Sequence, residues 1–187
     1  DLVYISHYTT GLKIIDIFDP TKPVEVAAYD TYLDDNEGGF YGCWGAFPFT
    51  SNSYIYASDM QYGLYILDFE EVHAGWVYGQ IYFNDTMPLI NTSIKSVLNN
   101  KVFYTDEDGY YTIGFPEGVH EFIINEENTV SIEFLPHQTV QHNIYLNSEL
   151  TLGDVNADNI IDVLDIIIIV NIIMDNVTPT TEQQWAA

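Results

Sequence analysis

The sequence predicts a mainly β chain with partial β-propeller blades, a seven-stranded antiparallel β-sandwich and a short C-terminal loop and helix. Three observations lead to this prediction. Residues 1–75 repeat a strand hairpin, and residues 76–149 hold seven short runs of alternating hydrophobicity. Residues 150–187 begin with an oxygen-rich loop and continue into an apolar run. These three ranges are the predicted domains.

The repeat in residues 1–75 has an offset of 52 positions. Six of thirteen positions are identical when Gly11 is aligned with Gly63; in the first copy these are Tyr4, Ser6, Gly11, Leu12, Ile14 and Asp16. Each copy reads as strand, Gly turn, strand. Strands are expected at residues 2–5, 12–17, 24–29, 54–57 and 64–69. Repeats built from four short strands are typical of propeller blades.

Two segments carry a family resemblance. Residues 11–26, Gly-Leu-Lys-Ile-Ile-Asp-Ile-Phe-Asp-Pro-Thr-Lys-Pro-Val-Glu-Val, resemble the LVIVD-type propeller repeat of bacterial surface proteins. Residues 38–49 resemble the last-blade insertion of the choice-of-anchor B group of that family. A propeller closes with about four to eight blades, so further blades are expected upstream and the chain is expected to be a fragment.

The insertion is rich in aromatic residues, which allow two interpretations. Its aromatic side chains are Phe40, Tyr41, Trp44, Phe47 and Phe49. They could form a platform on which sugars stack, or they could pack a long loop into the core. Core packing is the preferred interpretation.

Residues 76–149 are expected to fold as the sandwich. Its seven strands are predicted at 77–83, 92–97, 101–105, 110–113, 119–124, 130–134 and 141–146. For residues 106–109, a hairpin turn is favoured over a cation site because Asp-Gly between alternating runs is itself a hairpin signal. The order Val-x-Gly-x-Ile, Thr-x-x-x-Gly-x-Tyr and Gly-x-His-Glu-Phe resembles the carboxypeptidase regulatory-like domain. That resemblance implies a spacer or binding module without catalysis.

Residues 153–165, Gly-Asp-Val-Asn-Ala-Asp-Asn-Ile-Ile-Asp-Val-Leu-Asp, space oxygen donors as a hard cation requires. Donors fall at loop positions one, three, five, seven, nine and twelve: Asp154, Asn156, Asp158, the Ile160 carbonyl, Asp162 and Asp165. Calcium takes six to eight oxygens at flexible geometry. The loop is therefore predicted to bind Ca²⁺, and this interpretation is preferred to an acidic surface turn.

A helix is predicted from Val163 to Met174, with Leu164, Ile167 and Ile168 on one face. The loop and helix together closely resemble the first repeat of a type I dockerin. The resemblance implies that calcium orders the loop and that the helix binds a cohesin-like module. Its partner-binding residues would be Val163, Leu164, Ile167 and Ile168. The sequence ends where the family begins its second loop, so half a dockerin is expected.

The charge balance limits the partners. The chain has four Lys and Arg residues and twenty-eight Asp and Glu residues, which gives a net charge of −24. Nucleic acid is excluded as a partner because its phosphates would be repelled. The longest apolar run, Ile166 to Val170, is far too short to span a membrane. The single cysteine, Cys43, excludes an internal disulfide, and a weak calcium loop favours an extracellular or cell-surface location.

The sequence offers no residues on which to base an enzyme. His120-Glu121 begins like a zinc protease motif, but Ile124 stands where its second His should be. The five histidines are expected to be ordinary strand or surface residues. The favoured function is non-catalytic attachment to a cohesin-like partner. The alternatives are a carbohydrate or ligand receptor in which calcium only stabilises, and a propeller enzyme whose active site lies in other blades.

Overall fold

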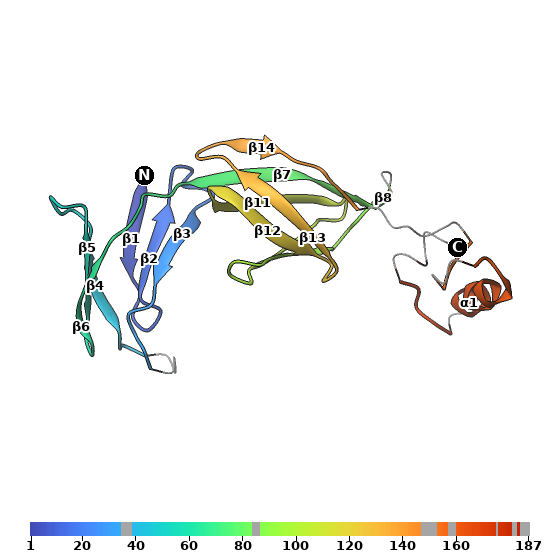
Figure 1. Cartoon of the computed structure of the whole chain (residues 1–187), viewed down its shortest axis with the longest axis horizontal. Coiled ribbons are helices and arrows are strands. Elements are labelled where there is room, and N and C mark those ends of the chain that lie inside the picture. Colours follow the sequence, from blue (N-terminus) through green and yellow to red (C-terminus); the bar gives the residue numbers. More distant parts are fainter. Residues whose placement is uncertain are drawn as a thin grey trace. The chain divides into compact units, whose positions relative to one another are not determined.

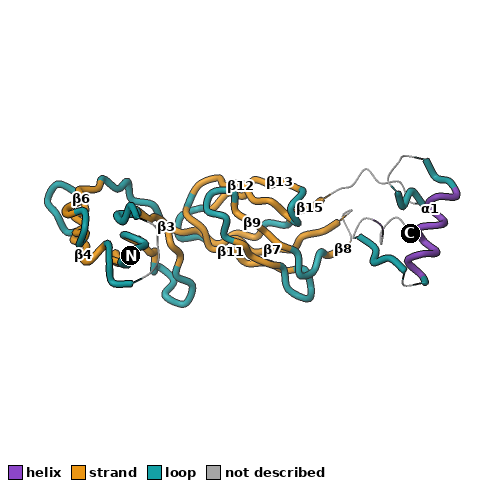
Figure 2. The backbone as a smooth tube through the Cα atoms, turned by 90° about the horizontal axis from the view of Figure 1, so that it is seen from below, coloured by secondary structure: helices purple, strands orange, loops and turns teal. Residues whose placement is uncertain are grey.

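The computed structural model describes residues 1–34, 39–83, 87–146, 153–156, 160–174, 176–180 and 183. These residues form fifteen β-strands and one α-helix, α1 (Figures 1 and 2). The strands are β1 (Leu2–Ser6), β2 (Leu12–Asp16), β3 (Val24–Tyr29), β4 (Cys43–Phe47), β5 (Ile55–Asp59), β6 (Gly63–Leu67), β7 (Ala74–Phe83), β8 (Met87–Pro88), β9 (Ser93–Ser96), β10 (Val102–Tyr104), β11 (Tyr110–Pro116), β12 (Gly118–Ile124), β13 (Asn128–Phe134), β14 (Thr139–Gln141) and β15 (Ile144–Leu146). The predicted mainly β class is confirmed. The chain divides into two compact units, residues 1–81 with 88–144 and residues 82–87 with 145–187.

The internal repeat appears as two hairpins with the same strand register. Strand β1 pairs with β2 so that Val3 lies opposite Ile15. Strand β5 pairs with β6 so that Ile55 lies opposite Leu67, which are the same two positions moved by 52 residues. The first sheet adds β3 next to β2, and the second adds β4 next to β5.

The two repeat sheets share a core. Leu12 and Ile14 of β2 are buried in one cluster with Val24 and Val26 of β3 and Ile55 of β5. The residues of the second copy that correspond to Leu12 and Ile14 are Leu64 and Ile66, and both are exposed. The face that is covered in the first copy is therefore open in the second.

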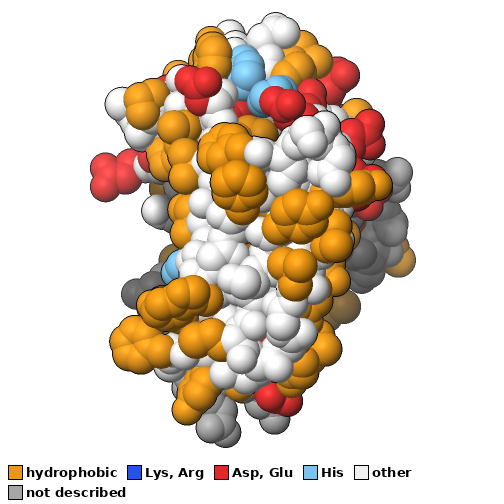
Figure 3. Space-filling model, turned by 90° about the vertical axis from the view of Figure 1, so that its left-hand side faces the viewer, with side chains coloured by type: hydrophobic (Ala, Val, Ile, Leu, Met, Phe, Trp, Pro, Cys, Tyr) orange, Lys and Arg blue, Asp and Glu red, His pale blue; other side chains and the backbone are white. Residues whose placement is uncertain are grey.

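Strand β4 was not expected from the sequence, and the preferred interpretation of the aromatic insertion was wrong. All five aromatic side chains are more than half exposed: Phe40, Tyr41, Trp44, Phe47 and Phe49. Phe47 lies opposite Tyr56 and, across the sheet, Ile66, on the open face of β4–β6. Figure 3, which looks from the side of Figure 1 where β4–β6 lie, shows many hydrophobic side chains on the surface.

Strands β7–β15 form two facing sheets. One has the order β10-β9-β12-β13, and the other has the order β11-β7-β14 with β8 and β15 also paired to β7. Phe115 of β11 packs against Phe122 of β12 and Phe134 of β13, with ring centroids 5.2 and 5.6 Å apart. These aromatic contacts between the sheets form the centre of the sandwich core, because all three rings are almost fully buried.

The sandwich differs from the predicted seven antiparallel strands. The run predicted at residues 141–146 is interrupted, and β14 pairs with β7 in parallel. Gly79 of β7 permits this arrangement, because a Cβ there would collide with the carbonyl oxygen of His142. The predicted turn at residues 106–109 is present, with the Gly109 N–H donating to the Asp106 carbonyl. It is not a hairpin, because β10 and β11 belong to different sheets.

Helix α1 (Val163–Ile173) lies in the second unit, close to the predicted bounds. Every residue of the helix is apolar except Asp165 and Asn171. β-Branched residues dominate it and have only moderate helix propensity, so capping interactions matter for its start. No helix among the described residues is long and apolar enough to cross a membrane.

Candidate functional site

The described ends of the predicted calcium loop meet at the carboxylate of Asp165. Asp154 and Asp165, at loop positions one and twelve, are each only 1% exposed. Oδ1 of Asp165 accepts hydrogen bonds from the N–H groups of Val155 at 2.7 Å and Asn156 at 3.1 Å, and Oδ2 accepts from the N–H of Asp162 at 2.8 Å. One carboxylate therefore joins both ends of the loop. Asp158, at position five, lies outside the described residues.

The Asp165 carboxylate also takes part in the N-terminal cap of α1. Asp162 is the N-cap and accepts a hydrogen bond from the Leu164 N–H at 2.7 Å, while Asp165 bonds back to the cap residue and completes a capping box. Hydrogen bonds from the N–H of Asp162, and then from Asn156 and Val155, outweigh burial and hold the pKa of Asp165 below its ordinary value. Asp165 is consequently ionised near neutral pH.

The predicted oxygen donors have different surroundings. Asn156 is half-buried, whereas Asp162 and Ile160 are exposed. A buried carboxylate at positions one and twelve with an exposed cap residue at position nine is compatible with Ca²⁺, because position nine often acts through water. Among the described residues, the ionisable side chains that lie close enough together to share a metal ion do not include those of Asp154, Asp162 and Asp165.

The predicted partner-binding residues are mostly accessible. Val163, Leu164 and Ile167 are at least half exposed, and Ile168 is partly buried. The apolar surface is wider than the single face predicted from the sequence, since Ile166 and Ile173 are also exposed. A helix that is apolar on all sides is normally buried, so the accessible surface of α1 suits contact with another protein segment.

A second cluster lies in the first unit, where three residues distant in sequence meet. Asp16 ends β2, His73 immediately precedes β7, and His137 precedes β14. Oδ2 of Asp16 lies 3.1 Å from Nε2 of His137 and 3.5 Å from Nδ1 of His73. The sequence predicts both histidines only as ordinary strand or surface residues. No local motif joins them, because Asp16 and His137 are 121 positions apart.

Asp16 is fully buried and ionised. Burial alone would raise the pKa of Asp16, but hydrogen bonds from the N–H groups of Ala74 and Phe18 and from His137 lower it below its ordinary value. The Phe18 N–H donates to Oδ1 at 2.8 Å and the Ala74 N–H donates to Oδ2 at 2.8 Å. These bonds fix the carboxylate so that Oδ2 faces the two imidazole rings.

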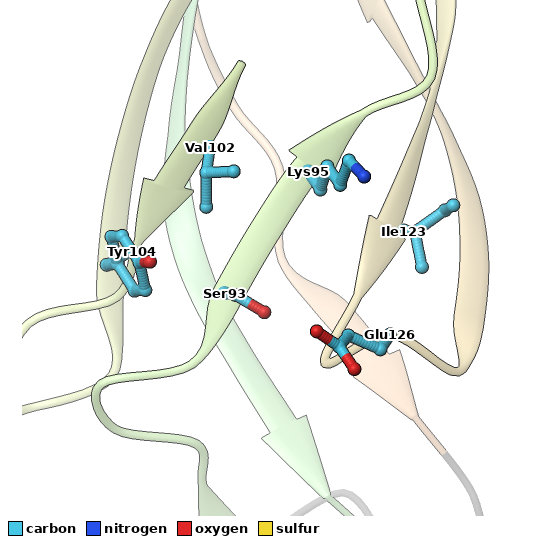
Figure 4. A pocket seen from close by; sticks show the side chains of 6 residues that line it. All are labelled: Ser93, Lys95, Val102, Tyr104, Ile123 and Glu126. Carbon is cyan, nitrogen blue, oxygen red and sulfur yellow. The ribbon is translucent and has the colours of Figure 1, made fainter. Parts of the chain in front are cut away.

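The outer face of the sheet β10-β9-β12-β13 carries an open pocket of about 360 Å³. Figure 4 shows its lining side chains, Ser93, Lys95, Val102, Tyr104, Ile123 and Glu126. Lys95 and Glu126 give it one charge of each sign. The pocket could hold a small polar ligand by hydrogen bonds and by contact with Tyr104.

Comparison with protein families matches the LVIVD repeat to residues 1–31. This range contains β1, β2 and β3 and ends with Thr31. No curated protein matches the chain. Residues 1–31 thus form an LVIVD repeat, and further β-sheets follow it.

Proposed function

We propose that the chain is a non-catalytic, secreted or cell-surface modular protein whose C-terminal segment, residues 150–187, is a calcium-ordered attachment device. Calcium would order the loop at residues 154–165, and α1 would then present its apolar side chains to a cohesin-like module. One observation carries the proposal. The Asp165 carboxylate links the predicted loop to the start of α1, whose Val163, Leu164 and Ile167 are accessible.

The charge of the loop supports a bound cation. Two carboxylates, Asp154 and Asp165, are almost completely buried within a chain of net charge −24. Buried carboxylates are costly unless hydrogen bonds or a cation compensate them. Three backbone N–H groups already compensate Asp165. Calcium would add a further compensating charge and leave α1 attached to an ordered loop.

The preceding modules would act as a spacer in this proposal. Residues 76–149 resemble the carboxypeptidase regulatory-like domain, and two facing sheets with a phenylalanine core are compatible with that family. The LVIVD repeat and the sheets after it would take no part in the attachment itself.

The test is calcium addition to the metal-stripped full chain. We expect the helical circular dichroism signal to rise and the loop to become more resistant to proteolysis, with half-saturation at roughly 10⁻⁴ to 10⁻³ M as in extracellular calcium modules. Asp154→Ala should remove the response. Glu133→Ala is the matched control, because Glu133 is an exposed acidic residue outside the loop. No response up to millimolar calcium would contradict the proposal.

A second candidate function is carbohydrate binding by the aromatic insertion. The exposure of Trp44 and Phe49 favours it, since sugars stack on accessible aromatic rings. The full chain would be applied to a glycan array beside the Trp44→Ala variant. Binding that is lost in this variant and insensitive to calcium removal would favour the receptor role over attachment.

A further inference from the structure

We propose that Asp16, His73 and His137 bind a divalent transition cation of the zinc class, with one coordination position left open to water. The three residues come from the end of β2 and from the segments before β7 and β14. The cation would tie the LVIVD repeat to the sandwich within the first unit. This site is separate from the calcium loop, and the inference does not rest on the proposed attachment function.

The distances suit such a cation. Zinc binds imidazole nitrogen and carboxylate oxygen at about 2.0–2.2 Å, so two ligands of a tetrahedral site lie about 3.3 Å apart. Here Oδ2 of Asp16 lies 3.1 Å from Nε2 of His137 and 3.5 Å from Nδ1 of His73. One ligand atom from each of the three residues lies within 4.8 Å of the others. Small movements would therefore complete the site.

Hydrogen bonding alone does not account for the cluster. Nε2 of His137 has a partner in Asp16, but Nδ1 of His73 is buried and has no hydrogen-bond partner among the described residues. An unsatisfied buried polar atom is costly and uncommon. A cation between the three side chains would use this nitrogen and the other two ligand atoms at once.

The surroundings hold both rings in place. Nε2 of His73 lies 3.4 Å from the carboxylate of Glu71, the arrangement in which a carboxylate orients a metal-binding histidine. The backbone of His73 is held by Glu117, whose N–H donates to the His73 carbonyl at 2.7 Å and whose side chain accepts from the His73 N–H at 2.8 Å. Glu117 therefore fixes the backbone position of His73, and Glu71 lies where a carboxylate can orient its ring.

His137 is held just as firmly. Its N–H donates to the Ala74 carbonyl at 2.7 Å, and its ring stacks on Phe18 with centroids 4.0 Å apart. Its φ of +56° is unusual for a residue with a side chain, and such backbone geometry often occurs at functional sites. The two histidine side chains are 26% and 27% exposed, so both rings can be reached from solvent, whereas Asp16 is fully buried behind them.

The LVIVD repeat itself does not create this cluster. Asp68 occupies the repeat position of Asp16 in the second copy, but it is exposed. The difference arises where the first repeat meets His73 and His137. Asp68 therefore provides a matched control.

The first experiment uses the unaltered full chain. Zn²⁺ would be titrated in millimolar Ca²⁺, which occupies oxygen-only sites, while the ring signals of the five histidines are followed by NMR. We expect one equivalent of Zn²⁺ to shift the signals of His73 and His137 and to leave those of His7, His120 and His142 unchanged. Shifts at the other three, or no saturable change, would overturn the proposal.

The second experiment uses variants and Co²⁺, whose visible absorption reports four-coordinate geometry. His73→Gln should weaken binding at least tenfold, and Asp16→Asn should do the same. Asp68→Asn and His7→Gln should bind as the unaltered chain does. Because His73 is partly exposed, its variant is expected to fold, which circular dichroism would check. Equal binding by folded His73→Gln would overturn the assignment.

Discussion

At the scale of single residues, side chains at equivalent repeat positions have different chemistry because their neighbours differ. Asp16 is buried and accepts hydrogen bonds from two backbone N–H groups and His137, whereas Asp68 is exposed. The repeat pattern alone would predict the same surroundings for Asp16 and Asp68. Only the segments that pack over the first copy make Asp16 a candidate ligand.

Tyr111 gives a prediction at the same scale. It is 3% exposed, its hydroxyl donates to the His142 carbonyl at 2.7 Å, and burial raises the pKa of its hydroxyl well above the ordinary value of about 10. Its neutral form thus stabilises the folded state below pH 10. This contribution is lost as pH rises, because the unfolded chain ionises first. The unfolding free energy should fall by at most about 1.4 kcal/mol per pH unit through this group.

Urea unfolding between pH 8 and 11 would measure this effect. Tyr111→Phe should lose about 1 kcal/mol at pH 8, since the hydroxyl contacts with the carbonyl and the ring Nδ1 of His142 are removed, and should show a smaller further loss above pH 10. Tyr110→Phe is the matched control, because that neighbouring side chain is exposed. Identical alkaline slopes in Tyr111→Phe and the unaltered chain would contradict the prediction.

At the scale of elements, the sequence predicts strands well where alternation is regular and turns are marked. The hairpins β1–β2 and β5–β6 were found because Gly11 and Gly63 mark equivalent turns between apolar runs. Strand β4 was missed because its pairing with β5 is irregular between Cys43 and Gly45 and its aromatic residues face solvent. An exposed aromatic run gives no alternation to detect.

The two candidate sites also differ in whether the sequence alone could predict them. The calcium-loop donors and the start of α1 lie within thirteen consecutive residues, so spacing alone could suggest them. The cluster of Asp16, His73 and His137 depends on tertiary structure. Ala74, which follows His73, donates its N–H to Asp16, and this hydrogen bond holds the start of β7 against the end of β2. No local spacing rule contains that contact.

The packing between the two repeat sheets yields a prediction for equivalent residues of β2 and β6. Ile14 is 3% exposed and packs in the core between the repeat sheets, whereas Ile66 is 59% exposed. Ile14→Ala should therefore destabilise the fold by about 2–5 kcal/mol, through lost burial and a cavity. Ile66→Ala should change the unfolding free energy by no more than about 0.5 kcal/mol. Chemical denaturation of both variants tests this, and equal losses would show that Ile66 is also covered in solution.

At the scale of the whole molecule, charge repulsion should dominate the response to salt. The net charge of −24 is offset by few cations, and Lys13–Glu25 is the one Lys–carboxylate ion pair found among the described residues. Raising the ionic strength from about 0.01 to 0.1 M shortens the screening length from about 30 to 10 Å. The melting temperature should rise accordingly in NaCl. Choline chloride should have the same effect, and a rise confined to NaCl would instead indicate bound sodium.

The two proposed cation sites lie in different compact units, so their effects should be independent. Calcium should change the helical signal of α1, whereas Zn²⁺ should raise the unfolding temperature of the sheets that contain Asp16. Added together, the cations should stabilise the chain by the sum of their separate effects, within about 0.5 kcal/mol, as expected for sites with no shared ligands. Asp154→Ala should remove only the calcium response and His73→Gln only the zinc response. Calorimetry of the full chain and both variants distinguishes this from one shared site, because competition at a shared site would make the combined stabilisation smaller than the sum.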